Sequence, residues 1–259
     1  MIKSCIVFYG IGRNVNLHRE ILFYRRAFDN PSFVYFLHRE NFLDNPRSEE
    51  TGSLDYSFIN DLDIPIVPVD MDNLGSYTDI LNRSIDPHND GRKSLNNLLK
   101  QLLMLSQIPS YLIHLESCEY FLVIRDDVKF SFFSKLILLL FPPIITKNCQ
   151  LFVSAFSWHY GVNDKFFIAG RRVMTITCNR LSKIEEFIDN SGYLNAERLL
   201  HYIIVLNKFE IVPLFVNVGR VRINGSTKWD KFIPAFTRLN DIYRVLRYRG
   251  KIGRKAESG

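Results

Sequence analysis

The stretch Tyr120-Phe-Leu-Val-Ile-Arg-Asp-Asp-Val-Lys-Phe130 decides the fold. Its first five residues are aromatic, β-branched or aliphatic, which predicts a buried strand in the middle of the chain. The strand ends abruptly at the charged triplet Arg125-Asp126-Asp127. In parallel sheets, ligands bind beyond the carboxyl ends of the strands, so charged side chains directly after a buried strand are candidate site residues.

Strands alternate with helices on the N-terminal side of this stretch. Residues 2–9 and 32–37 read as strands, and between them Leu17, Ile21, Tyr24 and Phe28 mark one face of a helix. The alternation predicts an α/β fold, a single Rossmann-like domain with a mixed, mostly parallel central sheet flanked by helices. We expect residues 1–225 to form this domain and residues 226–259 to form a basic, partly helical C-terminal extension.

Local signals define several further elements. We expect residues 39–63 to be a surface loop, because the stretch is polar and rich in turn residues. The helix that starts at Ser94 should end at Pro109, which lacks the N–H that a helix needs. Residues 171–189 should form one helix. Residues 64–69 contain two prolines, which predicts a short edge strand.

Composition and charge restrict the class of protein. With 47% hydrophobic and 23% charged residues, the 259-residue chain is not disordered, collagen-like or a coiled coil. Residues 1–130 hold 13 basic and 18 acidic side chains, whereas residues 131–259 hold 20 basic and 9 acidic ones. The basic half either meets an anionic partner, such as a phosphate ester, nucleic acid or lipid headgroup, or is a solvated face. The longest apolar run has ten residues, too few to span a bilayer of ~30 Å, so we expect a cytoplasmic protein.

Common catalytic motifs are missing. The six histidines form no H-E-x-x-H, and neither G-x-S-x-G nor a P-loop is present. Zinc hydrolases, α/β-hydrolases and P-loop NTPases are therefore disfavoured.

The first candidate site is the pair Asp126 and Asp127. Adjacent carboxylates after a buried strand can hold Mn²⁺ or Mg²⁺, which would neutralise a leaving diphosphate. The alternative is a turn in which one of these carboxylates accepts a backbone hydrogen bond. Gly10 and Arg13 follow the first strand, where glycine permits close approach of a ligand to the backbone.

Two later segments add candidates. Residues 158–164 combine stacking and hydrogen-bonding groups. Trp158, His159 and Asn163 are candidate acceptor-binding residues, and Asp164 is a candidate general base, unless the segment is only a hairpin loop.

Arg220 and Arg222 alternate along a predicted strand and so share one face. There they could bind a diphosphate, or simply form the polar face of an edge strand.

In this order the motifs resemble a family of small GT-A-type glycosyltransferases found in polysaccharide gene clusters and some large viruses. The resemblance rests on Gly10 and Arg13, the Arg125-x-Asp127 strand end, the Gly161 to Gly170 segment, and Arg220 to Arg222. It implies a GT-A-like fold and transfer of a hexosyl or deoxyhexosyl group from a nucleotide-sugar to a glycan or polyprenyl-linked acceptor.

The same resemblance implies roles for individual residues. Gly10, Arg13, Arg125, Asp126, Asp127, Arg220 and Arg222 would bind the donor, with Asp127 and Asp164 catalytic and Asp126 and Asp127 at any metal ion. Arg125 stands where a strict Asp-x-Asp motif needs an acid, and no histidine follows His201. Metal-independent chemistry, with Arg220 and Arg222 supplying the positive charge, is therefore an alternative.

Two other functions remain open. The chain could be a non-catalytic module that binds polyanions, although no specific nucleic-acid motif is present, or a transferase that has lost activity. The basic segment after residue 237 interleaves arginines with apolar residues, so it could lie on the inner face of a membrane or dock on the domain.

Overall fold

The computed structural model describes residues 3–45, 50–86, 88–115, 117–140, 145, 147–156, 162–191 and 194–230. Trp158, His159 and most of the predicted C-terminal extension, residues 231–259, lie outside the described residues. None of the described helices is both long enough and apolar enough to cross a membrane.

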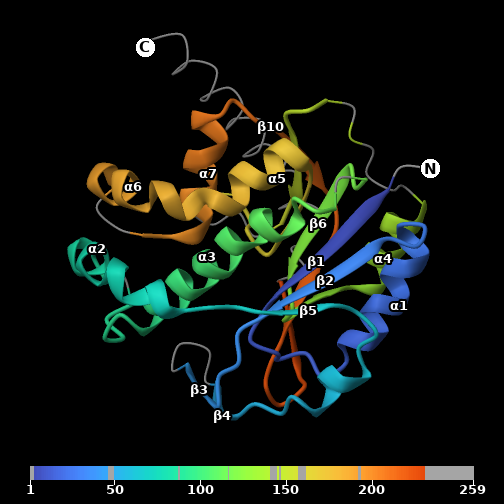
Figure 1. The fold of residues 1–259 in the computed structure, drawn as a ribbon, viewed down its shortest axis with the longest axis horizontal. Coiled ribbons are helices and arrows are strands. Elements are labelled where there is room, and N and C mark those ends of the chain that lie inside the picture. The colour runs from blue at the N-terminus through green and yellow to red at the C-terminus, as the bar shows by residue number, and fades with distance from the viewer. Residues whose placement is uncertain are drawn as a thin grey trace.

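A seven-stranded sheet forms the centre of the molecule (Figure 1). Its strand order is β10-β8-β9-β6-β1-β2-β5, and every neighbouring pair is parallel except the two that involve β9. The predicted mixed, mostly parallel α/β fold is therefore confirmed. The strands are β1 (Ser4–Gly10), β2 (Ser32–Leu37), β5 (Ile66–Pro68), β6 (Tyr120–Arg125), β8 (Gln150–Ser154), β9 (Phe166–Gly170) and β10 (Glu210–Leu214).

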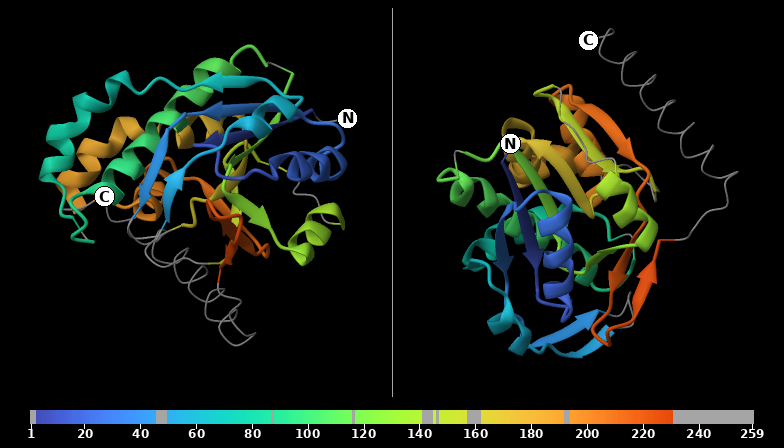
Figure 2. Two further views of the ribbon diagram at one scale, coloured as in Figure 1. Left: turned by 90° about the horizontal axis from the view of Figure 1, so that it is seen from below. Right: turned by 90° about the vertical axis from the view of Figure 1, so that its right-hand side faces the viewer.

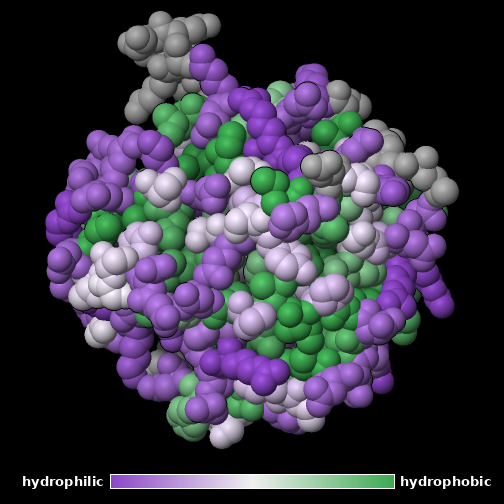
Figure 3. All heavy atoms as spheres, in the orientation of Figure 1, coloured by the Kyte–Doolittle hydropathy of each residue, from purple (hydrophilic) through white to green (hydrophobic). Residues whose placement is uncertain are grey.

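Helices cover both faces of this sheet (Figures 1 and 2). Alternate side chains of β1 show why: Val7 packs into the core beneath α3, α5 and α7, whereas Phe8 packs on the opposite side against α1 and α4. The helices are α1 (Leu17–Ala27), α2 (Thr78–Arg83), α3 (Lys93–Leu112), α4 (Phe132–Leu140), α5 (Arg171–Cys178), α6 (Ile184–Ser191) and α7 (Ala196–Leu206), with 3-10 turns η2 (Ser57–Asp61), η3 (Asp72–Tyr77) and η4 (Asn179–Lys183). On the face seen in Figure 1, polar side chains predominate over α2 and α6 (Figure 3).

Two small sheets lie beside the central one. After Asp127 the chain enters β7 (Val128–Phe130), which pairs with β11 (Val218–Val221), and β11 pairs with β12 (Thr227–Trp229). The register places Arg220 opposite Val128, directly after the acidic pair. The other small sheet is the hairpin of β3 (Phe42–Asn45) and β4 (Glu50–Ser53).

Three local predictions are wrong. Residues 39–63 are not a plain loop, since they contain β3, β4 and η2, whose short polar strands have no apolar alternation to reveal them. α3 continues through Pro109 to Leu112, because fully buried Ile108 and Leu112 hold the last turn against the core. The helix expected over residues 171–189 is interrupted by η4.

The close packing of β1 on the loop after β6 gives a testable consequence. A Cβ atom on Gly10 would lie 2.0 Å from Oδ1 of the buried Asp126. We therefore expect Gly10→Ala to lower the free energy of unfolding by about 2–3 kcal/mol, measured by urea denaturation. Gly75→Ala is the control, because a Cβ there meets nothing within 4 Å. A Gly10→Ala protein as stable as the control would contradict the packing.

Candidate active site

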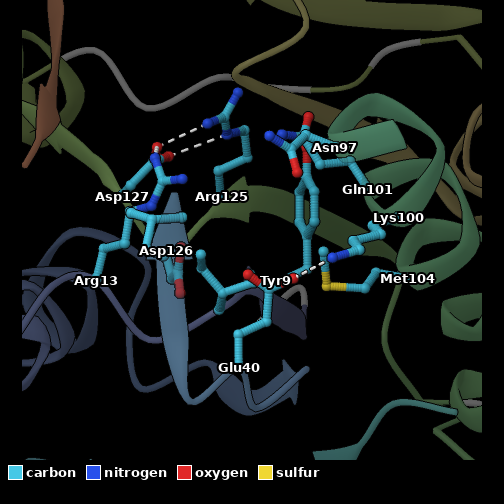
Figure 4. Close-up of a pocket in the computed structure, with 13 residues that line it drawn as sticks. Tyr9, Arg13, Glu40, Asn97, Lys100, Gln101, Met104, Arg125, Asp126 and Asp127 are labelled. Atoms are coloured by element: carbon cyan, nitrogen blue, oxygen red, sulfur yellow. Dashed lines mark hydrogen bonds and ion pairs between the residues drawn. The ribbon is translucent and has the colours of Figure 1, made fainter. Parts of the chain in front are cut away.

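A cleft opens where β1 and β6 end (Figure 4). One wall carries the arginine-rich loops, and the other is the face of α3 with Asn97, Lys100, Gln101 and Met104. The cleft has a cavity volume of only ≈ 40 Å³, so a ligand of nucleotide size would lie mostly along its open side. The remaining lining residues are Tyr9, Gly10, Ile11, Arg13, Glu40, Leu43, Arg125, Asp126 and Asp127.

The carboxylate of Asp127 is the centre of this wall. Arg125 forms a bidentate pair with it, from Nε to Oδ1 at 2.9 Å and from Nη2 to Oδ2 at 2.6 Å. Arg220 contacts Oδ2 at 3.3 Å and Arg13 at 3.4 Å. Burial alone would raise the pKa of Asp127, but the charges of Arg125, Arg220 and Arg13 lower it well below its usual range. The carboxylate of Asp127 is therefore ionised in the folded protein at neutral pH.

A second carboxylate, that of Glu50, contacts two arginines close to Asp127. Its Oε2 accepts from Arg222 Nη1 at 2.6 Å and lies 3.5 Å from Arg13 Nη1. Arg13 thus bridges Glu50 and Asp127, and Arg220 and Arg222 join the same cluster through different acids. The charge of Arg125 lowers the pKa of Arg220, which reflects repulsion among the guanidinium groups. We call the four arginines Arg13, Arg125, Arg220 and Arg222 the arginine cluster.

Asp126 points the other way from its neighbour. Its Oδ2 accepts from the Gly12 N–H at 2.5 Å and from the Tyr35 hydroxyl at 2.7 Å. Burial, reinforced by the negative charge of Asp127, raises the pKa of Asp126 to about 6. Asp126 lines the cleft, but its hydrogen bonds tie the loop after β1 to the end of β6.

Asp164 lies near the cluster but is not part of it. One of its oxygens is 4.0 Å from the buried Arg180, and its charge acts on both Tyr9 and Arg125. Asn163 is buried, with its amide donating to the Phe156 carbonyl and its oxygen accepting from the Lys165 N–H. Those contacts fix the loop, and acceptor binding by Asn163 stays a prediction.

Several residues in the cleft or in contact with the arginine cluster were not expected from the sequence. Glu50 lies in the polar stretch read as a loop, and no local pattern distinguishes it from its neighbours. Glu40 and Lys100 form an ion pair on the wall opposite the arginines. Because the two residues are 60 positions apart, no local pattern predicts their pairing. The position of Lys100 on the polar side of an amphipathic helix could, however, have been predicted from the sequence of α3.

A divalent cation does not fit the acidic pair as it is arranged. The oxygens of Asp127 already face three guanidinium groups, and Asp126 is turned under Gly10. A dication here would replace hydrogen bonds with cation–cation repulsion. Within the described part of the chain, no group of three His, Cys, Asp or Glu side chains could hold a metal ion.

The main observation at this site is that the residues predicted to bind the donor lie close together. Gly10, Arg13, Arg125, Asp126 and Asp127 line one cleft, and Arg220 and Arg222 join through Asp127 and Glu50. Their roles toward a ligand stay predictions.

Comparisons with known proteins found a distantly similar structure and no related sequence. No protein-family profile and no curated protein matches the sequence. Among solved structures, one that is similar is described as a glycosyltransferase involved in the glycosylation of the major capsid of PBCV-1. The two share 13% identity over 82% of each chain, with a TM-score of 0.43. A likeness this distant assigns no activity.

The opposite pKa shifts of the acidic pair can be tested by pH. The folded pKa of Asp126 is about 6, above its ordinary 3.8, so between these values the folded state holds a proton that the unfolded state has lost. Its contribution to stability therefore falls as pH rises from about 4 to 7. In Asp126→Asn, which keeps an oxygen for Gly12 and Tyr35, this loss should be absent. We expect the stability difference between variant and wild type to shift by roughly 2 kcal/mol across that range, measured by urea denaturation.

Exposed Asp61→Asn controls for the loss of one negative charge in that experiment. Parallel pH–stability curves for wild type and Asp126→Asn would show that Asp126 is not held in this way.

Proposed function

We propose that the chain is a glycosyltransferase that moves a hexosyl or deoxyhexosyl group from a nucleotide-sugar to a hydroxyl of a glycan or polyprenyl-linked acceptor. The observation that carries the proposal is the arginine cluster at the carboxyl ends of β1 and β6. Four guanidinium groups there face two carboxylates, those of Glu50 and Asp127. Clefts at this edge of a parallel sheet are where such folds bind ligands.

The contact distances indicate how a diphosphate would bind. The Arg125–Asp127 pair is short and bidentate, whereas the contacts of Arg220 and Arg13 with Asp127 are 3.3–3.4 Å. The side chain of Arg220 is also 30% exposed, far more than Asp127 at 2%. Phosphate oxygens would therefore replace Asp127 at Arg220 and Arg13, since guanidinium groups bind phosphate in a bidentate manner. Asp127 would keep Arg125 in place.

The reaction then needs stabilisation of the leaving group and removal of one proton. The bond between the sugar's anomeric carbon and the phosphate oxygen breaks as a bond to the acceptor oxygen forms. Negative charge develops on the diphosphate, and the arginine cluster stabilises it with dipoles and charges already in place. In an inverting reaction Asp164 takes the acceptor proton, a role supported by the electrostatic interaction of its charge with Tyr9 and Arg125.

The cluster also bears on the choice between metal-dependent and metal-independent chemistry. Arginines already supply the positive charge that Mn²⁺ or Mg²⁺ would otherwise bring, and the acidic pair does not offer a free coordination site. We therefore propose the metal-independent form. Addition of EDTA should change the affinity for a nucleoside diphosphate by less than about twofold.

A panel of nucleotide-sugars tests the proposal as a whole. The full chain is heated with UDP-, GDP- and dTDP-sugars, each with Mn²⁺ and with EDTA, and sugar release is assayed in parallel. One donor at 100 Kd should raise the stability by about 2.7 kcal/mol and should be hydrolysed slowly or transferred. If no nucleotide-sugar stabilises the protein, the proposal fails. If a nucleotide-sugar binds but is not turned over with any acceptor, the chain is a transferase that has lost its activity.

Arg220→Gln tests the diphosphate site separately from the fold. Because Arg220 is partly exposed and makes only long contacts, its removal should leave the protein folded while weakening nucleoside diphosphate binding by about 10- to 100-fold. Arg172→Gln, an exposed arginine on α5, is the matched control. Titration calorimetry measures both. Equal affinities in the two variants would remove Arg220 from the site.

A further inference from the structure

The outward face of α4 is apolar along its whole length. Phe132 and Phe133 are 75% and 71% exposed, and Leu136, Leu139 and Leu140 are 42%, 45% and 62% exposed. Successive positions lie one or three residues apart, a spacing that puts all five on one side of the helix. Ser134 and Leu138 face the domain and are buried. We call the five exposed residues the α4 face.

Such a face is unusual on a free surface. Single exposed apolar side chains are ordinary, but a contiguous group of two phenylalanines and three leucines marks a contact with another molecule or a membrane. A helix that is apolar on both sides is normally covered on both sides. The α4 face therefore implies a partner surface.

The neighbouring helix α1 limits what that partner is. Lys135 of α4 pairs with Glu20 of α1 at 2.9 Å and lies 4.9 Å from the centre of the Phe23 ring, so the two helices lie side by side. They occupy the same side of the central sheet in Figures 1 and 2. The solvent side of α1 carries Arg19 and Arg26 together with Leu22, which is 54% exposed.

No acidic side chain of α1 or α4 is exposed on this surface, and the nearby exposed Asp63 pairs with Arg25 of α1 rather than with Arg19 or Arg26. Within α1 and α4, both fully described, the acid is Glu20, which is buried and paired with Lys135. No ion pair among the described residues involves Arg19 or Arg26. The surface thus combines a stripe of large apolar side chains with adjacent positive charge, the composition of helices that lie in a membrane interface.

We propose that the α4 face and the outer side of α1 bind the surface of an anionic lipid bilayer. The phenylalanines and leucines enter the boundary between headgroups and acyl chains, and Arg19 and Arg26 contact the anionic headgroups. A symmetric contact between two copies fits less well, because it brings the same cations together without acids to neutralise them. Phospholipid phosphates supply that negative charge.

The position of this surface relates it to the proposed active site. The three residues of β7 and Ser131 connect Asp127 to the start of α4, an extended path of roughly 16 Å. A polyprenyl-linked acceptor held in the bilayer would therefore have its headgroup near the cleft. That consequence rests on the proposed function, whereas lipid binding itself does not.

Vesicle co-sedimentation of the full chain without nucleotide tests the proposal. The protein should sediment with vesicles of 70% phosphatidylcholine and 30% phosphatidylglycerol, and weakly with phosphatidylcholine alone. Phe132→Ser/Phe133→Ser should lower the partition coefficient by about 10- to 100-fold. Arg19→Gln/Arg26→Gln should remove most of the preference for the anionic vesicles. Gel filtration of every variant reports its oligomeric state.

Matched variants separate this surface from general changes in polarity or charge. Ile85→Ser/Ile113→Ser removes two exposed apolar side chains elsewhere, and Arg172→Gln/Lys208→Gln removes two distant cations; both should bind like the wild type. Full binding by Phe132→Ser/Phe133→Ser would overturn the proposal and assign lipid binding to another part of the chain. So would a wild-type dimer that ignores vesicles and becomes monomeric in that variant. Because nucleotide is absent, neither result bears on donor binding.

Discussion

One buried carboxylate, that of Asp127, holds together three positively charged side chains from separate parts of the chain. Arg13 comes from the loop after β1, Arg125 from the end of β6, and Arg220 from β11. Without the carboxylate between them these guanidinium groups would repel one another in a poorly solvated place, an arrangement that costs several kcal/mol. Asp127 therefore joins the central sheet to the small β7–β11–β12 sheet through ion pairs at the lining of the cleft.

The two adjacent aspartates show how burial and partners set opposite properties in one turn. Asp126 meets hydrogen-bond donors that are neutral, so burial dominates and its pKa rises. Asp127 meets three cations, so attraction dominates and its pKa falls. Under the proposed function, such a site would bind a phosphate ester by exchanging one negative partner of the arginines for another, which would leave the arginines in place.

The sequence predicted the strand over residues 120–124 and its abrupt end at Arg125, because apolar runs and charged stops are local signals. It also predicted that Arg220 and Arg222 share one face of a strand, since alternation along a strand is local too. It did not reveal their partners. Glu50 is separated from Arg222 by 172 positions, and its segment lacks the apolar period that identifies strands. Pairings of this range depend on the register between β7 and β11, which is set by packing of the whole domain rather than by any short motif.

The basic residues of the C-terminal half do not all form one exposed basic surface. In the described structure Arg220 and Arg222 from the basic half are neutralised by Asp127 and Glu50 from the acidic half, so part of the imbalance is used inside the cleft. The cations beside α4 come instead from α1, in the acidic half of the sequence. Apolar periodicity could locate α4 as a helix but not say which side is covered, because both sides are apolar. Only the position of α1 and of the core shows that the side with Phe132 and Phe133 faces outward. The proposal of an anionic surface as its partner rests on the exposed Arg19 and Arg26 of α1, whose charge such a surface would match.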